Sequence, residues 1–159
     1  MKLPLSMAAV FLTAISMGIA LAPAEVRADG ESPLVVAHKM VNAWNARDVD
    51  AIADLFAEDG RFLSMTAPPA VKEGREVIRK EWGALLAGVS EIELQLRNIT
   101  VSGNSVLIER LDVFTYNGKL GRVPVACVLD IENGKVQEWR EYYDRASLLS
   151  EMGVEQIGE

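Results

Sequence analysis

The chain has 159 residues, half of them hydrophobic, and a formal net charge of −7 at neutral pH. This length fits one globular domain, and the acidic balance without a lysine or arginine cluster argues against nucleic acid as a partner. One cysteine excludes an intramolecular disulfide and, with one histidine, makes no transition-metal site by spacing, so we expect neither a metal nor a cofactor.

The first 28 residues have the features of a secretory signal. Lys2 is a minimal basic region, residues 3–21 are almost wholly apolar, and small-residue motifs follow. We predict a signal peptide over 1–24, with cleavage after residue 28 as an alternative, and therefore an exported protein, periplasmic or secreted. A retained membrane anchor is the other interpretation, because the apolar run is nearly long enough to span a bilayer. After cleavage, no stable membrane insertion is expected.

Residues 25–32 are polar and are interpreted as a flexible lead-in to a single domain over 33–153. Ser32-Pro33 is typical of a helix start, and apolar residues at helical spacing predict a helix to about residue 46. A second helix is expected over 49–60, then a short strand over 61–65. A third helix is predicted over 74–86, with a glycine as its stop.

The pattern then changes to alternation, which predicts four long strands over 91–101, 105–116, 119–132 and 135–143. Asn-Gly pairs join the last three strands, and such pairs favour tight hairpin turns. Asp144 is well placed to cap a short final helix. The expected fold is α+β: a cone-shaped curved antiparallel sheet wrapped around three N-terminal helices, plus a short C-terminal helix.

Charged residues interrupt an apolar strand face in the second half of the chain. Arg110 and Asp112 are two apart and therefore point the same way, together with apolar neighbours. Glu141 lies on a later strand and can converge with them if the hairpin registers allow it. A buried charged cluster is costly unless the charges are paired or used. We therefore interpret Arg110, Asp112 and Glu141 as candidate catalytic residues, with a structural ion pair between Arg110 and Asp112 as the alternative.

The order of helices and strands resembles the nuclear-transport-factor-2-like, or SnoaL-like, superfamily, which includes ketosteroid isomerases and polyketide cyclases. More narrowly, residues 109–113 (Glu-Arg-Leu-Asp-Val) and 139–144 (Trp-Arg-Glu-Tyr-Tyr-Asp) resemble the limonene-1,2-epoxide hydrolase family. Short segments at 56–59, 68–70 and 74–75 lie in similar places. The resemblance covers about residues 33–150.

This resemblance implies one-step hydrolysis of an epoxide on a small hydrophobic molecule, without a metal, a cofactor or a covalent intermediate. Asp112 would protonate the epoxide oxygen, and Glu141 would take a proton from the attacking water. Arg110 would bridge the two acids. The chain departs from the family pattern on the water side, where Glu141 replaces an aspartate, Phe62 a tyrosine and Ser64 an asparagine.

We expect the substrate to contact residues of the first helix and of the inward strand faces. The candidates are Val41, Trp44, Phe62, Ser64, Phe114, Val123, Val125, Cys127 and Tyr143. The resemblance also implies a homodimer, and the opposite face of the meander is apolar enough to need a cover.

Two other functions remain open. A non-catalytic binding protein for a hydrophobic small molecule is favoured by the residues at positions 62 and 64. An isomerase or cyclase would need a general base near the end of the first strand or helix pair, where the chain offers Asp59 and little else.

Overall fold

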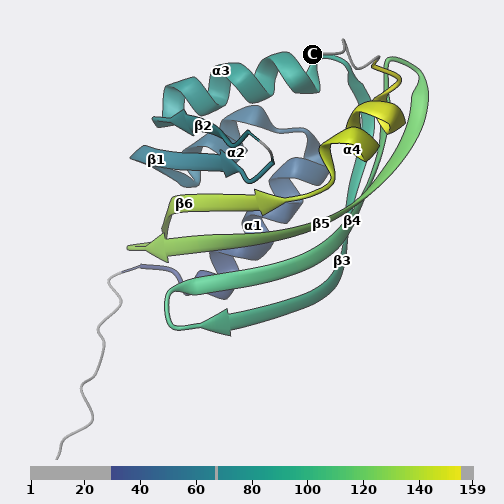
Figure 1. The fold of residues 1–159 in the computed structure, drawn as a ribbon. Coiled ribbons are helices and arrows are strands. Elements are labelled where there is room, and N and C mark those ends of the chain that lie inside the picture. The colour runs from purple at the N-terminus through teal and green to yellow at the C-terminus, as the bar shows by residue number, and fades with distance from the viewer. Residues whose placement is uncertain (1–29, 67, 155–159) are drawn as a thin grey trace, which may run out of the picture.

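The computed structural model describes residues 30–66 and 68–154. The predicted signal peptide and residues 25–29 of the lead-in lie outside the described residues. Helices and strands follow one another as drawn in Figure 1, with these bounds: α1 Pro33–Ala46, α2 Val49–Asp54, β1 Phe56–Ser64, β2 Ala70–Glu73, α3 Arg75–Leu86, β3 Val89–Ser102, β4 Ser105–Tyr116, β5 Lys119–Glu132, β6 Lys135–Tyr142 and α4 Arg145–Met152.

Aspartate side chains cap the starts of two helices, α2 and α4. The α2 helix starts at Asp48, whose side chain accepts a hydrogen bond from the backbone N–H of Ala51 at 2.9 Å. The α4 helix starts in the same way at Asp144, which accepts from the N–H of Ser147 at 2.6 Å, and it ends at Gly153 with φ +73°. The predicted capping role of Asp144 is confirmed.

The predicted meander of hairpins is also confirmed. The six strands form one sheet in the order β2-β1-β6-β5-β4-β3. Both Asn-Gly turns have positive φ at both residues (47° and 82° at 117–118, 52° and 74° at 133–134), as the tightest hairpins require. These turns set the register that places Cys127 of β5 beside both Ile108 of β4 and Glu141 of β6.

The predicted second helix is too long. It ends at Asp54, and the chain becomes strand β1 at Phe56, which pairs in parallel with β6. The sheet is therefore mixed, whereas a purely antiparallel one was expected. Gly60 lies in an irregular part of this pairing, where an added Cβ would stand 3.0 Å from the carbonyl oxygens of Ala57 and Val136. Strand β2, which pairs with β1, was not predicted.

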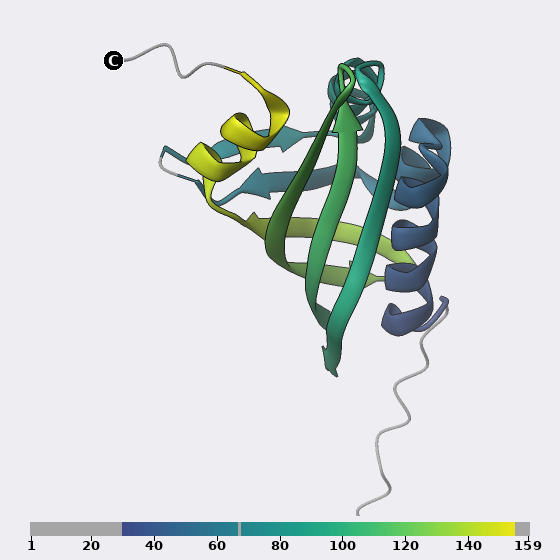
Figure 2. The same ribbon diagram turned by 90° about the vertical axis from the view of Figure 1, so that its right-hand side faces the viewer.

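An aromatic cluster forms the centre of the core beneath the helices. Trp82 packs edge-on against Trp44, Phe62 and Trp139, with ring centroids 5.0–5.7 Å apart. The long strands β3–β5 curve strongly, and Figure 2 shows α1 and α4 on opposite sides of them. None of the helices among the described residues has the length and apolar character needed to cross a membrane.

The outer face of β4 and β5 carries apolar side chains, as expected. Leu107 is 48% exposed there, and Leu111, Val113, Ala126 and Val128 are half-buried. The homodimer that this face suggested stays a prediction.

Candidate active site

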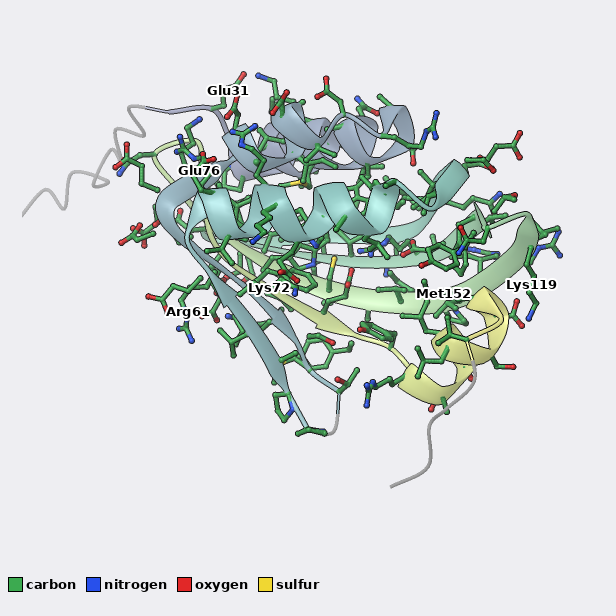
Figure 3. All side chains as sticks on the ribbon, turned by 90° about the horizontal axis from the view of Figure 1, so that it is seen from above. Glu31, Arg61, Lys72, Glu76, Lys119 and Met152 are labelled. Atoms are coloured by element: carbon green, nitrogen blue, oxygen red, sulfur yellow. The ribbon has the colours of Figure 1, made fainter. Side chains whose placement is uncertain are left out.

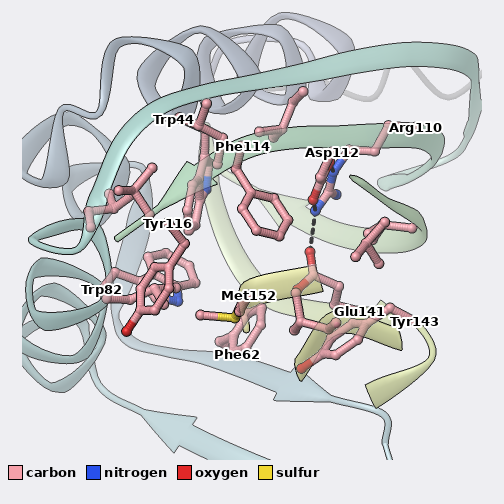
Figure 4. A pocket seen from close by; sticks show the side chains of 18 of the residues that line it. Trp44, Phe62, Trp82, Arg110, Asp112, Phe114, Tyr116, Glu141, Tyr143 and Met152 are labelled. Atoms are coloured by element: carbon pink, nitrogen blue, oxygen red, sulfur yellow. Dashed lines mark hydrogen bonds and ion pairs between the residues drawn. The ribbon is translucent and has the colours of Figure 1, made fainter. Parts of the chain in front are cut away.

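The three predicted ionisable residues meet on the inner face of the sheet. Arg110 and Asp112 lie on β4 between Ile108 and Phe114, and the alternation of the strand turns all four side chains inward. Glu141 reaches the same place from β6, two strands away. Figure 4 shows the three side chains at one end of a cavity, with a dashed line joining Arg110 and Glu141.

Arg110 lies between the two acids and binds both. Its Nε donates to Oδ1 of Asp112 at 2.7 Å and its Nη2 to Oδ2 at 3.0 Å, which makes a bidentate pair. The same Nη2 donates to Oε1 of Glu141. The guanidinium is only 4% exposed, and the carboxylate side chains of Asp112 and Glu141 are 16% and 14% exposed.

Two further contacts hold the guanidinium. Its Nη1 donates to Sγ of Cys127 at 3.0 Å, and its Cζ stands 5.6 Å from the centre of the Trp139 ring, within the range of a cation–π contact. Burial raises the pKa of the Cys127 thiol to about 12. Cys127 is therefore a neutral sulfur acceptor at physiological pH and a poor nucleophile.

The cluster holds two carboxyl groups for one guanidinium. Burial raises the pKa of Glu141 above its ordinary value, against the opposing effect of the Arg110 charge, and the nearby Asp112 adds to the rise. Burial alone would lower the pKa of Arg110, but Glu141 and Asp112 outweigh it and hold that pKa above its ordinary value. Arg110 is therefore always charged, whereas Glu141 is a stronger base than an exposed glutamate.

The cluster forms one wall of a cavity of about 380 Å³. Such a volume is at the lower end of the range for small-molecule sites. The remaining walls are mostly aromatic and aliphatic, so most of the surface that a ligand meets in the cavity is apolar. Of the predicted substrate contacts, six line it: Trp44, Phe62, Phe114, Val123, Val125 and Tyr143.

Three of the predicted contacts lie behind the cavity wall. Val41 of α1 is buried in the core, one helical turn before Trp44, and does not line the cavity. Cys127 is fully buried behind Arg110. Ser64 is 6% exposed, and its hydroxyl forms a hydrogen bond with that of Tyr143 at 2.8 Å.

Helices α3 and α4 contribute cavity walls that were not predicted from the sequence. Trp82, Leu85 and Leu86 of α3 and Leu148 and Met152 of α4 line the cavity. The spacing of four between Leu148 and Met152 is a helical signal that could have identified the α4 wall. Lys72 of β2 and Glu81 of α3 also line it and form an ion pair at 2.7 Å. In Figure 3, Lys72 lies beside α3 and Met152 on α4.

Comparisons with known proteins agree with this architecture. The sequence model of the SnoaL-like domain matches residues 37–139. A Catenulispora acidiphila protein with a ketosteroid isomerase-like fold, in complex with trimethylamine, has 24% identity and a TM-score of 0.68, covering 79% of this chain and 96% of its own.

Two further structures with the same fold have names that suggest activities. An LEH-like epoxide hydrolase from M. tuberculosis has 18% identity and a TM-score of 0.65, covering 76% of this chain and 88% of its own. A candidate SnoaL-like polyketide cyclase from Shewanella putrefaciens has 18% identity and a TM-score of 0.67, covering 76% and 96%. At these identities the likeness establishes the fold alone.

Proposed function

The chain belongs to the SnoaL-like domain family, and from this premise we propose that it is an enzyme that adds water to the epoxide of a small hydrophobic molecule and releases a diol. The contact of Asp112, Arg110 and Glu141 at one end of an apolar cavity carries the proposal. An epoxide needs a proton on its oxygen and a nucleophile at its carbon. Two carboxyl groups held by one cation can supply the proton and activate the water.

The reaction balances with these groups alone. Glu141, ionised, accepts a proton from a water molecule while the water oxygen forms a bond to a ring carbon. The bond from that carbon to the ring oxygen breaks, and the oxygen takes the proton of Asp112. The step leaves Glu141 protonated and Asp112 ionised, and a net proton transfer from Glu141 to Asp112 restores the enzyme.

The geometry favours this reaction over a purely structural ion pair. A buried pair is rarely more stable than apolar residues of similar size, so stability alone gives little reason for a second carboxyl group at the same guanidinium. The raised pKa of Glu141 brings its basicity closer to neutral pH, where a general base is most effective. The cluster also faces a cavity rather than a packed neighbour.

A non-catalytic binding protein is the second candidate. Phe62 supports it, because this ring lines the cavity where the resembling hydrolases have a tyrosine. The isomerase or cyclase reading is weaker in this structure, since Asp59 is exposed and is not among the residues that line the cavity.

A panel of cyclic terpene, styrene-type and long-chain epoxides tests the proposal, with diol formation followed by mass spectrometry. Wild-type protein and Glu109→Gln should form diol, because Glu109 is exposed on the opposite face of β4. Asp112→Asn should lose about 100-fold or more in rate. If epoxides raise the melting temperature but no diol forms, the binding protein is the correct reading.

A further inference from the structure

A chain of three hydroxyl groups reaches the cavity beside Glu141. The Thr66 hydroxyl is 3.2 Å from the carbonyl oxygen of Pro68, the Ser64 hydroxyl is 3.3 Å from that of Thr66, and the Tyr143 hydroxyl is 2.8 Å from that of Ser64. Only Tyr143 of the three lines the cavity.

The sheet places the end of this chain at the flank of Glu141. Ser64 is the β1 partner of Glu141 in the parallel β1–β6 ladder, so the two residues are neighbours across the strands. Tyr143 follows Glu141 by two residues, which turns both side chains toward the cavity. Figure 4 shows the Tyr143 ring beside Glu141, with its hydroxyl directed toward Phe62.

The number of hydrogens available decides which hydroxyl donates in each of these hydrogen bonds. A hydroxyl has one hydrogen to donate and can accept through its oxygen. Because the Pro68 carbonyl can only accept, Thr66 donates to it, and the Ser64 hydrogen then goes to Thr66. Tyr143 in turn donates to Ser64. With Ser64 as its one partner in the described part of the chain, the Tyr143 oxygen can still accept a hydrogen bond at the cavity.

We propose that Tyr143 and Glu141 together bind the water that attacks the substrate, with Ser64 and Thr66 as residues that position the Tyr143 hydroxyl. The water donates one hydrogen to the Glu141 carboxylate and the other to the Tyr143 oxygen, so its lone pairs face the cavity. Glu141 removes its proton in the step described above, and Tyr143 holds its orientation. This inference rests on the proposed function for the use of the water as a nucleophile.

Kinetics of substituted proteins test the orienting role. Tyr143→Phe should lower kcat on an active epoxide by about 100-fold, the order expected for a misplaced reacting group, with KM unchanged. Tyr142→Phe is the matched control, because the neighbouring ring is 43% exposed. Thr66→Val should give a smaller loss of kcat. It removes the acceptor of the Ser64 hydroxyl hydrogen, so the hydrogen bond between Ser64 and Tyr143 can form with either residue as the donor. Tyr143→Phe with unchanged kcat would overturn the proposal.

A rescue separates orientation from packing. Phe62 also lines the cavity, and the Tyr143 hydroxyl points toward it, so Phe62→Tyr in the Tyr143→Phe protein puts a hydroxyl back near the same place. Recovery of kcat by tenfold or more supports a water contact, because a packing defect at position 143 would not be repaired from position 62.

Crystal structures of the wild-type and Tyr143→Phe proteins give a readout that needs no activity. We expect an ordered water within hydrogen-bond distance of both Glu141 and Tyr143 in the wild type, displaced or absent in Tyr143→Phe. A wild-type structure with no such water overturns the inference, whether or not diol forms. If the ordered water is present but the protein forms no diol, the water site is supported and the proposed hydrolysis is contradicted.

Discussion

Replacing Arg110 with methionine removes the one cation among the described residues that contacts both Asp112 and Glu141. Methionine is of similar length and apolar, so the change leaves Asp112 and Glu141 without their shared partner while filling much of the same space. Breaking a buried ion pair from one side costs about 3–5 kcal/mol. For a domain of roughly 120 residues, the entropy of unfolding is about 0.25 kcal/mol per degree, so Tm should fall by about 12–20 °C.

The loss should depend on pH in a defined direction. Without Arg110, folding at neutral pH must either bury two unpaired carboxylates or take up protons to neutralise them. Both lower the free energy of unfolding. Below about pH 4 both carboxyl groups are protonated in the unfolded chain as well, so the difference from wild type should shrink. Thermal unfolding followed by circular dichroism between pH 3 and 8 measures this dependence.

Two variants make the experiment decisive. Arg140→Met is the matched control, because Arg140 is 26% exposed and its bonds to Asp130 and Glu138 are those of a surface pair worth about 1 kcal/mol or less. Adding Asp112→Asn and Glu141→Gln to Arg110→Met should restore most of the lost stability. A fall in Tm no larger than that of Arg140→Met would show that Arg110 does not stabilise a buried ionised cluster.

Three other substitutions or reagents give separate tests. Glu141→Gln should raise Tm at neutral pH, because burial raises the pKa of Glu141 and its ionisation therefore costs stability as pH rises above the ordinary glutamate value of about 4.3. The same variant should lower diol formation by about 10²- to 10⁴-fold, and equal Tm values at pH 7 would contradict the buried charge. The Cys127 thiol should react slowly with a thiol reagent at pH 8 in the folded protein and quickly after unfolding. The reason is that it is fully buried with a pKa of about 12. Rapid labelling of the folded protein would show that Cys127 is not buried. Gly121→Ala should lower the free energy of unfolding by about 1–3 kcal/mol, because the new Cβ would lie 2.7 Å from the Phe114 ring and 2.9 Å from the Glu151 carbonyl oxygen. An unchanged Tm would mean that α4 can shift without a cost in stability.

Local signals in the sequence predict most of the strand registers that build the site. The Asn-Gly turns at 117–118 and 133–134 have the positive φ angles that tight hairpins need, and they fix β4, β5 and β6 relative to one another. Alternation within the strands then places Arg110, Asp112 and Glu141 on one face. These residues could be identified because every step from turn to face is local.

The parts that were missed depend on pairing between distant segments. Phe56 continues the helical spacing of the apolar residues of α2, yet it pairs in parallel with Val136 of β6, about 80 residues later. No local pattern encodes that choice, because tertiary pairing overrides local propensity. The hydrogen bond between Ser64 and Tyr143 could not be predicted for the same reason, since it needs the β1–β6 ladder.

In the proposed mechanism water attacks the epoxide directly, and a single-turnover reaction in ¹⁸O-labelled water tests this step. With enzyme in excess over an active epoxide, direct attack puts the label into the diol in the first turnover and leaves the protein unlabelled. An unlabelled first-turnover diol, with ¹⁸O appearing in the carboxyl group of Asp112 or Glu141, would show a covalent ester intermediate and rule out direct attack by water.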